Sequence, residues 1–202
     1  MPQTALIVID VQNGFCPGGN LAVPGGDAIV PGVNAAMEKA DIVVLTQDWH
    51  PAGHSSFAST HPGRSPYDVI DMPYGPQVLW PDHCVQGTPD GAFHPDLDVD
   101  RADAIVRKGT DPAIDSYSAL FENDHRTPTG LHGWLRDRGV GAVAMVGLAT
   151  DFCVAYSALD AARLGLDVTV DLSLTRAIDL DGSLDGALVK MREAGVTLTG
   201  QP

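Results

Sequence analysis

At 202 residues with 44% apolar residues, the chain is long enough for one well-buried core and short for two full-sized domains. We therefore expect a single domain over residues 1–202. The formal charge of −14 disfavours nucleic acid or an anionic membrane as a partner, because both repel such a surface. The first apolar run is broken by Asp10 before it reaches signal-peptide length, so we expect a cytoplasmic protein with a small neutral substrate.

Short, almost continuously apolar segments predict β-strands that are covered on both faces, at Ala5–Ile9, Ile42–Thr46, Ala104–Val106, Ala142–Val146 and Val168–Val170. Helical patterns lie between several of these strands, at Asp27–Ala40, Pro128–Arg138, Phe152–Leu164 and Ser183–Ala194. Strands that alternate with helices predict a doubly wound α/β fold with a mainly parallel sheet and helices on both faces.

The segment from Trp49 to Asp100 interrupts this alternation. It contains eight of the fifteen prolines and five of the seven histidines, and it shows no sustained helical or strand period. A loop region of this length in a compact domain is usually functional or disordered. The histidines, together with the aromatic residues Trp49, Phe57 and Trp80, favour a functional loop insertion.

Reactive side chains follow four of the predicted strands. The first strand ends in Asp10, the second in Asp48-Trp49-His50 and the third in Lys108, while the fourth leads to Cys153 at the start of a helix. Because ligands bind beyond the carboxyl ends of the strands in open parallel sheets, we expect these side chains to meet at one edge of the sheet.

Cys153 is the candidate nucleophile. The unpaired N–H groups in the first turn of a helix favour a thiolate, whereas a free cysteine of pKa ~8.5 is only a few per cent ionised at neutral pH. Lys108 can stabilise the thiolate, and Asp10 can accept and return a proton. The alternative is a structural ion pair between Asp10 and Lys108 with Cys153 as a packing residue, but the three residues together favour catalysis.

Asp48, His50 and His83 are candidate ligands of a divalent metal ion. Asp48 and His50 are two residues apart in an extended segment, so their side chains project to the same side, and His83 adds a second imidazole. This set suits zinc most closely, with iron or manganese as alternatives, and leaves coordination positions open. His54 is either a further ligand or a residue that supports the ligands. The alternative roles are a cap for Asp48 and a hydrogen-bonded loop imidazole for His83.

The remaining thiols and imidazoles are assigned structural roles. The three cysteines have no metal-ligand spacing and cannot all be paired within one chain, so we expect Cys16 and Cys84 to be small buried apolar residues. We expect surface or loop positions for His61, His94, His125 and His132.

A phosphate-binding loop is excluded, because no glycine stands five residues before Gly109.

Five stretches of the chain together resemble nicotinamidases, within the isochorismatase-like superfamily of cysteine hydrolases. They occur in the same order as in that family, and the resemblance extends to about Leu164. Phe152, next to the nucleophile, occupies a position that varies in the family. The tail after Thr175 carries no site signature. The stretches are VIDVQNGFCPGGNLAV at Val8–Val23, TQDWHP at Thr46–Pro51, WPDHCVQGT at Trp80–Thr88, RKGTDPAIDSYSAL at Arg107–Leu120 and VGLATDFCV at Val146–Val154.

The resemblance implies a role for each matching position. It implies a cis peptide at Leu148–Ala149, and an oxyanion hole formed by the backbone N–H groups of Ala149 and Cys153. It implies a catalytic triad of Asp10, Lys108 and Cys153. The implied metal ligands are Asp48, His50 and His83. The implied aromatic pocket contains Phe15 and Trp80, with Trp49 and Tyr117 as further candidates.

The expected function is hydrolysis of nicotinamide, and of pyrazinamide, to the acid and ammonia through a Cys153 thioester, in NAD salvage. One alternative is another amidase of the superfamily that acts on a ureido or carbamoyl compound; such relatives generally lack the metal ligands. A non-haem iron oxygenase also uses two histidines and a carboxylate, but it leaves Cys153 unexplained. A non-catalytic metal-binding protein has no need of a nucleophile. The sequence leaves a homo-oligomer open.

Overall fold

The computed structural model describes residues 3–201 and contains a six-stranded parallel sheet in the order β5-β2-β1-β6-β7-β8. The doubly wound parallel fold predicted from the sequence is therefore confirmed. The strand order reverses between β1 and β6, and the carboxyl ends of these two strands flank the position where such sheets bind ligands. The strands are β1 Gln3–Ile9, β2 Ile42–Asp48, β5 Ala104–Lys108, β6 Val140–Leu148, β7 Asp167–Arg176 and β8 Thr197–Thr199.

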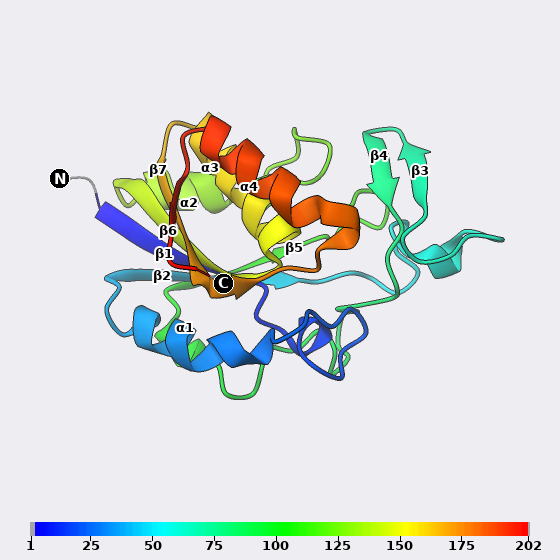
Figure 1. Cartoon of the computed structure of the whole chain (residues 1–202), viewed down its shortest axis with the longest axis horizontal. Coiled ribbons are helices and arrows are strands. Elements are labelled where there is room, and N and C mark those ends of the chain that lie inside the picture. Colours follow the sequence, from blue (N-terminus) through cyan, green and yellow to red (C-terminus); the bar gives the residue numbers. More distant parts are fainter. Residues whose placement is uncertain (1–2, 202) are drawn as a thin grey trace.

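Helices cover both faces of the sheet. Helix α1 lies on one face, and α3 and α4 lie on the other (Figure 1). The helix predicted at 128–138 begins only after Gly130, whose φ of 95° ends the preceding turn. The helix predicted from Phe152 begins instead as a π-helical turn, Thr150–Val154. The helices are α1 Val30–Met37, α2 Leu131–Arg136, α3 Ala155–Arg163 and α4 Ser183–Glu193.

The core is formed by the central strands and the helix faces packed on them. Ile7 on β1, Val44 on β2 and Met145 on β6 have no exposed surface, and Met37 of α1 and Ala158 of α3 close the two sides. Burial of one such large aliphatic side chain stabilises the fold by roughly 1.5–3 kcal/mol. This packing holds the strand ends, and therefore the residues that follow them, in fixed positions.

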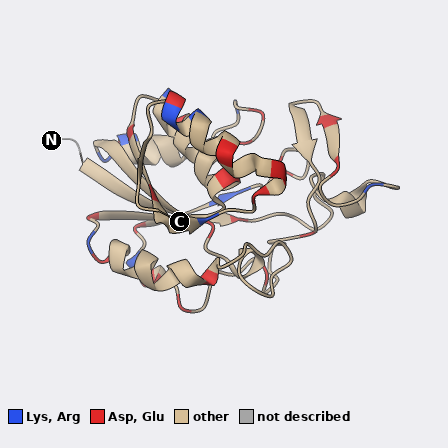
Figure 2. Cartoon of the chain, in the orientation of Figure 1, with Lys and Arg blue, Asp and Glu red and all other residues tan. Residues whose placement is uncertain are grey.

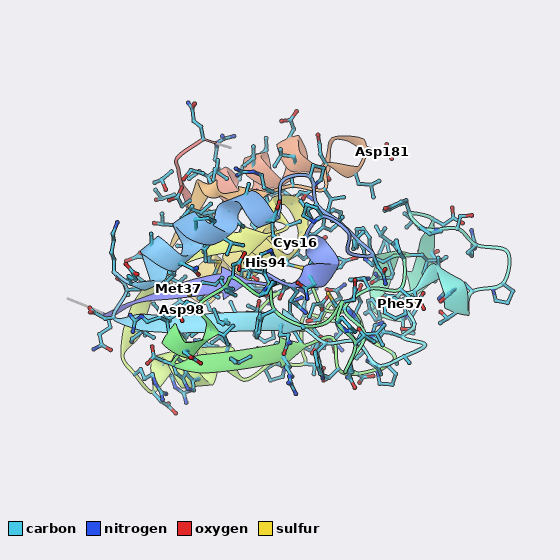
Figure 3. All side chains as sticks on the ribbon, turned by 90° about the horizontal axis from the view of Figure 1, so that it is seen from below. Cys16, Met37, Phe57, His94, Asp98 and Asp181 are labelled. Carbon is cyan, nitrogen blue, oxygen red and sulfur yellow. The ribbon has the colours of Figure 1, made fainter. Side chains whose placement is uncertain are left out.

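The prediction that segment 49–100 has no regular structure was wrong in one part. Strands β3 (Val69–Met72) and β4 (Gly75–Val78) form an antiparallel hairpin at the far end of the molecule, and Phe57 lies on the same side (Figures 1 and 3). Each strand has only four residues, too few for a clear period. The edge strand β8 was missed for the same reason.

The net negative charge does not mark one binding face. Acidic residues are distributed over helices and loops on several sides of the chain (Figure 2). Between residues 3 and 201, the structure contains no helix with the length and hydropathy that a membrane span requires.

Candidate active site

The topology brings Asp10, Lys108 and Cys153 to one edge of the sheet. Asp10 directly follows β1, Lys108 ends β5, and Cys153 lies in the π-helical turn after β6. Asp10 has a φ of 47°, which turns the chain sharply at the end of the strand. Its position is fixed by Thr46, whose hydroxyl donates to Asp10 Oδ1 at 2.6 Å and accepts from the Asp10 N–H at 3.1 Å.

Lys108 is the centre of this group of residues. Its Nζ lies 2.9 Å from Asp10 Oδ2, 3.1 Å from Asp48 Oδ1 and 3.6 Å from Cys153 Sγ, and it donates to the Ser116 carbonyl at 2.8 Å. Asp10 and Lys108 have no exposed surface. The structure thus brings the three predicted triad residues together, and it links them to the predicted metal ligand Asp48.

The buried charges set the protonation of the group. Burial lowers the pKa of Lys108, but the carboxylates of Asp10 and Asp48 outweigh it and raise that pKa well above its usual value. Burial raises the pKa of Asp10, although Lys108 opposes the shift. Lys108 therefore stays charged at neutral pH, and Asp10 is a stronger base than an exposed aspartate.

Cys153 is a thiol that needs a base. Burial raises its pKa well above the usual value, and the positive charge of Lys108 only partly opposes this shift. A position at the start of a helix is therefore not enough to ionise this thiol, which needs a base, as expected from the sequence. Asp10 Oδ2 makes an ion pair with Lys108 but no well-aligned hydrogen bond within the described chain, so it can accept the thiol proton.

Asp48, His50 and His83 form a second buried group beside Lys108. One potential ligand atom from each lies within 4.8 Å of the others. His83 donates from Nδ1 to the Pro81 carbonyl at 2.8 Å, which leaves Nε2 as an acceptor 3.3 Å from Asp48 Oδ2. His50 Nδ1 lies 3.4 Å from the same oxygen and has no hydrogen-bond partner among residues 3–201.

This group fits a divalent cation. Lone pairs of two imidazoles and one carboxylate converge, and an unpartnered buried nitrogen needs a partner of this kind. Gly109 (φ 65°) allows the close approach, since a Cβ there would lie 2.9 Å from His50 Nε2 and 3.2 Å from Asp48 Oδ1. Burial raises the pKa of Asp48, but His50, which is protonated when no ion is bound, and Lys108 outweigh it and hold that pKa far below its usual range, so Asp48 is a carboxylate.

His54 packs on His50 but offers no free nitrogen. Its Nδ1 accepts from the Ser56 N–H at 3.1 Å, and its Nε2 lies 2.8 Å from the Asp111 carbonyl, to which it donates. Although His50, His54 and Asp115 also lie close enough to share an ion, both ring nitrogens of His54 are occupied by protein partners. Of the two roles considered for His54, the geometry favours support of His50.

Aromatic side chains enclose a small cavity between the two groups. Phe15, Trp80 and Tyr117 line it, as predicted, together with Phe152, which packs edge-on against Trp80 with ring centroids 4.9 Å apart. Trp49 is not among the lining residues; it is half-buried and stacks on Arg107, whose Cζ lies 4.2 Å from the ring centroid. The resemblance correctly anticipated the cis peptide at Leu148–Ala149, next to the cavity.

One wall of the cavity comes from a segment without any motif that would have selected it in advance. Ile178 lies after Thr175, in the tail without a site signature, and lines the cavity. The carboxylate of Asp151, in the turn that carries Cys153, accepts hydrogen bonds from the N–H groups of Ile178 and Asp179 and from the Ser183 hydroxyl. Asp151 thus attaches the tail to the nucleophile turn.

Replacement of Asp151 with Ala is expected to lower the free energy of unfolding by about 2–4 kcal/mol, because three donors lose a charged acceptor. The KM for the substrate should also rise, since Ile178 is released. Urea unfolding and steady-state kinetics measure the two effects. Asp137→Ala removes an exposed aspartate and should change stability by less than about 0.5 kcal/mol. Equal stability of the two variants would contradict the assigned role of Asp151.

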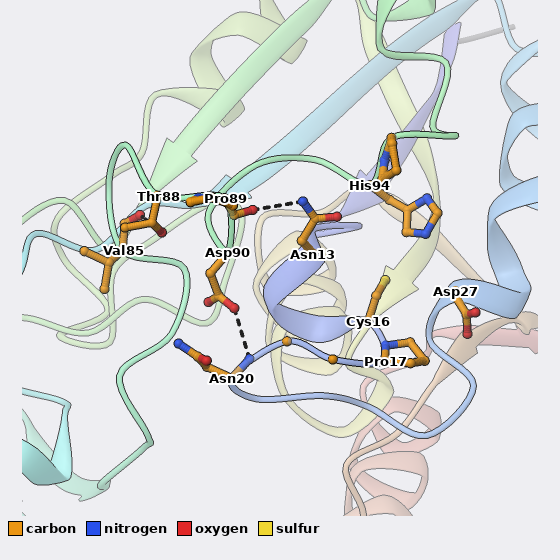
Figure 4. Close-up of a pocket in the computed structure, with 13 residues that line it drawn as sticks. Asn13, Cys16, Pro17, Asn20, Asp27, Val85, Thr88, Pro89, Asp90 and His94 are labelled. Carbon is orange, nitrogen blue, oxygen red and sulfur yellow. Dashed lines mark hydrogen bonds between the residues drawn. The ribbon is translucent and has the colours of Figure 1, made fainter.

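A larger cavity of about 580 Å³ lies outside this group (Figure 4). Its lining includes Cys16, Asp27, Asp90 and His94 but none of the triad or metal candidates. Burial and the nearby Asp27 raise the pKa of Cys16 to about 11, so its thiol is a weak nucleophile at neutral pH. Size therefore does not identify the reactive site in this chain, and Cys16 keeps its predicted role as a buried apolar residue.

Comparisons with known proteins show which family the chain resembles over its length. A nicotinamidase from Acinetobacter baylyi is 56% identical over 192 residues, which are 95% of this chain and 90% of that protein. A solved nicotinamidase/pyrazinamidase from Acinetobacter baumanii superposes with a TM-score of 0.97 at 52% identity, covering 99% of this chain and 97% of the other. The pyrazinamidase of Pyrococcus horikoshii, solved in complex with zinc, superposes with a TM-score of 0.79 at 36% identity, covering 98% and 99%. The model of the isochorismatase domain matches residues 4–201, and the chain belongs to this family.

Proposed function

We propose that this protein is a nicotinamidase, which hydrolyses nicotinamide to nicotinate and ammonia and accepts pyrazinamide as well. The observation that carries the proposal is the position of Lys108, whose Nζ lies 3.6 Å from Cys153 Sγ, 2.9 Å from Asp10 and 3.1 Å from Asp48. One ammonium group joins the nucleophile, the base and a metal ligand. The names of the relatives at 56% and 52% identity support the same substrate.

The first half of the reaction forms a thioester. Asp10 takes the thiol proton of Cys153, and the sulfur attacks the carboxamide carbon while the C=O bond opens to an oxyanion. In this proposal, the backbone N–H groups of Ala149 and Cys153 donate hydrogen bonds to this oxygen. The tetrahedral species collapses with cleavage of the C–N bond, and Asp10 returns its proton to the departing nitrogen, which leaves as ammonia.

The second half releases the acid. A water molecule attacks the thioester carbon while Asp10 accepts one of its protons, and the C–S bond breaks to give nicotinic acid and the Cys153 thiolate. The acid loses its remaining proton to solvent and leaves as nicotinate. Asp10 then reprotonates the sulfur, which restores the starting state. Lys108 remains charged throughout, because its pKa is raised, and it stabilises the thiolate in both halves.

Asp48, His50 and His83 would hold one divalent ion, for which zinc is the first candidate. When bound, the ion supplies an electron-pair acceptor for the ring nitrogen and so orients the substrate. The chain supplies the rest of the binding: Phe15 and Trp80 flank the ring, and the cavity directs the amide toward Cys153.

Entry of the substrate requires the cavity to widen. About 20 Å³ is open between its walls, roughly the space of one water molecule, whereas an aromatic amide has nine or more heavy atoms. Phe152 and Ile178 are the partly exposed side chains of the wall, so we expect these two to move.

The test is ammonia release from nicotinamide, compared with benzamide, which has the same shape without the ring nitrogen. We expect turnover of nicotinamide with metal, a loss of at least about 100-fold in kcat/KM after chelation, and recovery on addition of zinc. Benzamide should be poor in every state. No ammonia from nicotinamide in the metal-loaded protein, with turnover of a carbamoyl compound, would overturn the proposal. A role in NAD salvage and a cytoplasmic location stay predictions from the sequence.

A further inference from the structure

The mechanism leaves the hairpin β3–β4 without a role, although its Gln77 bonds to two residues that line the cavity, Asp115 and Tyr117. Gln77 is 1% exposed. Its amide nitrogen lies 2.6 Å from Asp115 Oδ2, 2.7 Å from the Val78 carbonyl and 3.0 Å from the Tyr117 hydroxyl. Its amide oxygen accepts from the Tyr74 hydroxyl at 3.2 Å and from Asn123 Nδ2 at 3.3 Å. A buried amide with this many partners is held in one orientation.

One branch of this network leads to the candidate metal ligands. The second oxygen of the Asp115 carboxylate, Oδ1, accepts a hydrogen bond from His50 Nε2 at 3.1 Å and another from the Ser116 N–H at 2.8 Å. The proton on Nε2 keeps Nδ1 as the lone-pair nitrogen that faces Asp48. Gln77 therefore holds the carboxylate that sets the tautomer and ring orientation of His50.

The other branch leads to the aromatic wall. The Tyr117 hydroxyl oxygen accepts from Gln77 and also from Trp80 Nε1, each at 3.0 Å. Trp80 and Tyr117 both line the cavity, and Phe152 packs edge-on against the two rings. The Gln77 amide therefore fixes the orientation of the aromatic wall as well as that of the metal-ligand candidate His50.

We propose that Gln77 is a positioning residue that sets the distance between the metal ligand His50 and the aromatic wall at Trp80. This inference rests on the proposed function, in which one substrate ring contacts the ion and the wall at the same time. A ring held at two points tolerates little error between them, because misplacement by about 1 Å costs roughly 100-fold in rate.

The test compares Gln77→Met, which keeps the length of the side chain and removes its polar atoms, with Tyr117→Phe, which removes only the hydroxyl. Val69→Ala, on the exposed strand of the same hairpin, is the matched control. For each protein, zinc affinity is measured by competition with a chromophoric chelator, and KM and kcat for nicotinamide are measured at saturating zinc.

We expect Gln77→Met to weaken zinc binding by about tenfold or more, as loss of a group supporting metal ligands does, and to raise KM even at saturating zinc. Tyr117→Phe should raise KM with zinc affinity unchanged, and kcat should fall less than KM rises in both variants, because the triad is not touched. If Gln77→Met is unfolded, Gln77→Asn, which keeps the amide one carbon shorter, should show the same effects.

The inference is overturned if the folded Gln77 variant keeps zinc affinity and KM within twofold of the wild-type values and only its melting temperature falls, since that result indicates a structural role. Equal loss of zinc affinity in Val69→Ala would also overturn it. If the wild-type protein releases no ammonia from nicotinamide, the proposed function fails, but zinc affinity still decides the metal branch.

Discussion

Replacement of Cys153 with Ala is expected to lower kcat for ammonia release from nicotinamide by at least about 10⁴-fold, without loss of bound zinc. The thioester cannot form without the sulfur, whereas Asp48, His50 and His83 do not contact Cys153 in the structure's hydrogen-bond and ion-pair network. Steady-state kinetics and metal analysis on the same sample measure the two properties.

The matched control is Cys16→Ala, which removes another buried thiol that lies outside the site. It should keep kcat and KM within about twofold of the wild type. Rapid quenching of the wild-type reaction should also reveal a protein species heavier by the nicotinoyl group, carried on the peptide that contains Cys153. Near-normal turnover by Cys153→Ala would mean that another group attacks the amide.

Replacement of Lys108 with Met should abolish activity and destabilise the fold. Asp10 and Asp48 would then be buried carboxylates without the cation that lies 2.9 and 3.1 Å from them. Loss of one partner from a buried ion pair costs about 3–5 kcal/mol, and kcat/KM should fall by about 10³-fold or more. Urea unfolding of the metal-free protein at pH 7.5 measures the stability.

The stability deficit of Lys108→Met should depend on pH. Burial already raises the pKa of Asp10, and removal of Lys108 takes away the main group that lowers it. A carboxyl group whose pKa is higher in the folded than in the unfolded state, where it is about 3.9, destabilises the fold as pH rises through that interval. The deficit should therefore be smallest near about pH 4 and largest at neutral pH. Lys190→Met, which removes an exposed lysine, should show little deficit at either pH.

The sequence could predict the site where function depends on local position. Asp10, Asp48 and Lys108 follow apolar runs that can only be strands, and parallel strands bring their carboxyl ends together. Cys153 follows β6 in the same way. Their convergence follows from a parallel sheet, so the prediction of that sheet was enough to place them at one edge.

Contacts between distant segments could not be predicted in this way. Ile178 is held at the cavity by the hydrogen bond from its N–H group to Asp151, and Gln77 is brought to the site by a hairpin of two four-residue strands. Trp49 follows Asp48 directly and was expected in the wall, but alternation along an extended chain turns it outward onto Arg107. Hydrogen bonds also decide the role of His54, which spacing left open.

The carboxylate shared by Lys108 and the histidine pair restricts how this scaffold can diverge. A descendant that loses Asp48, and with it the binding of the cation, would also lose one of the two carboxylates that neutralise the ammonium of Lys108, the one 3.1 Å away, and would disturb the acid–base chemistry next to it. Loss of the ion and preservation of amide cleavage therefore require a second, compensating replacement near Lys108. Recruitment to substrates without a pyridine nitrogen should accordingly proceed through paired substitutions.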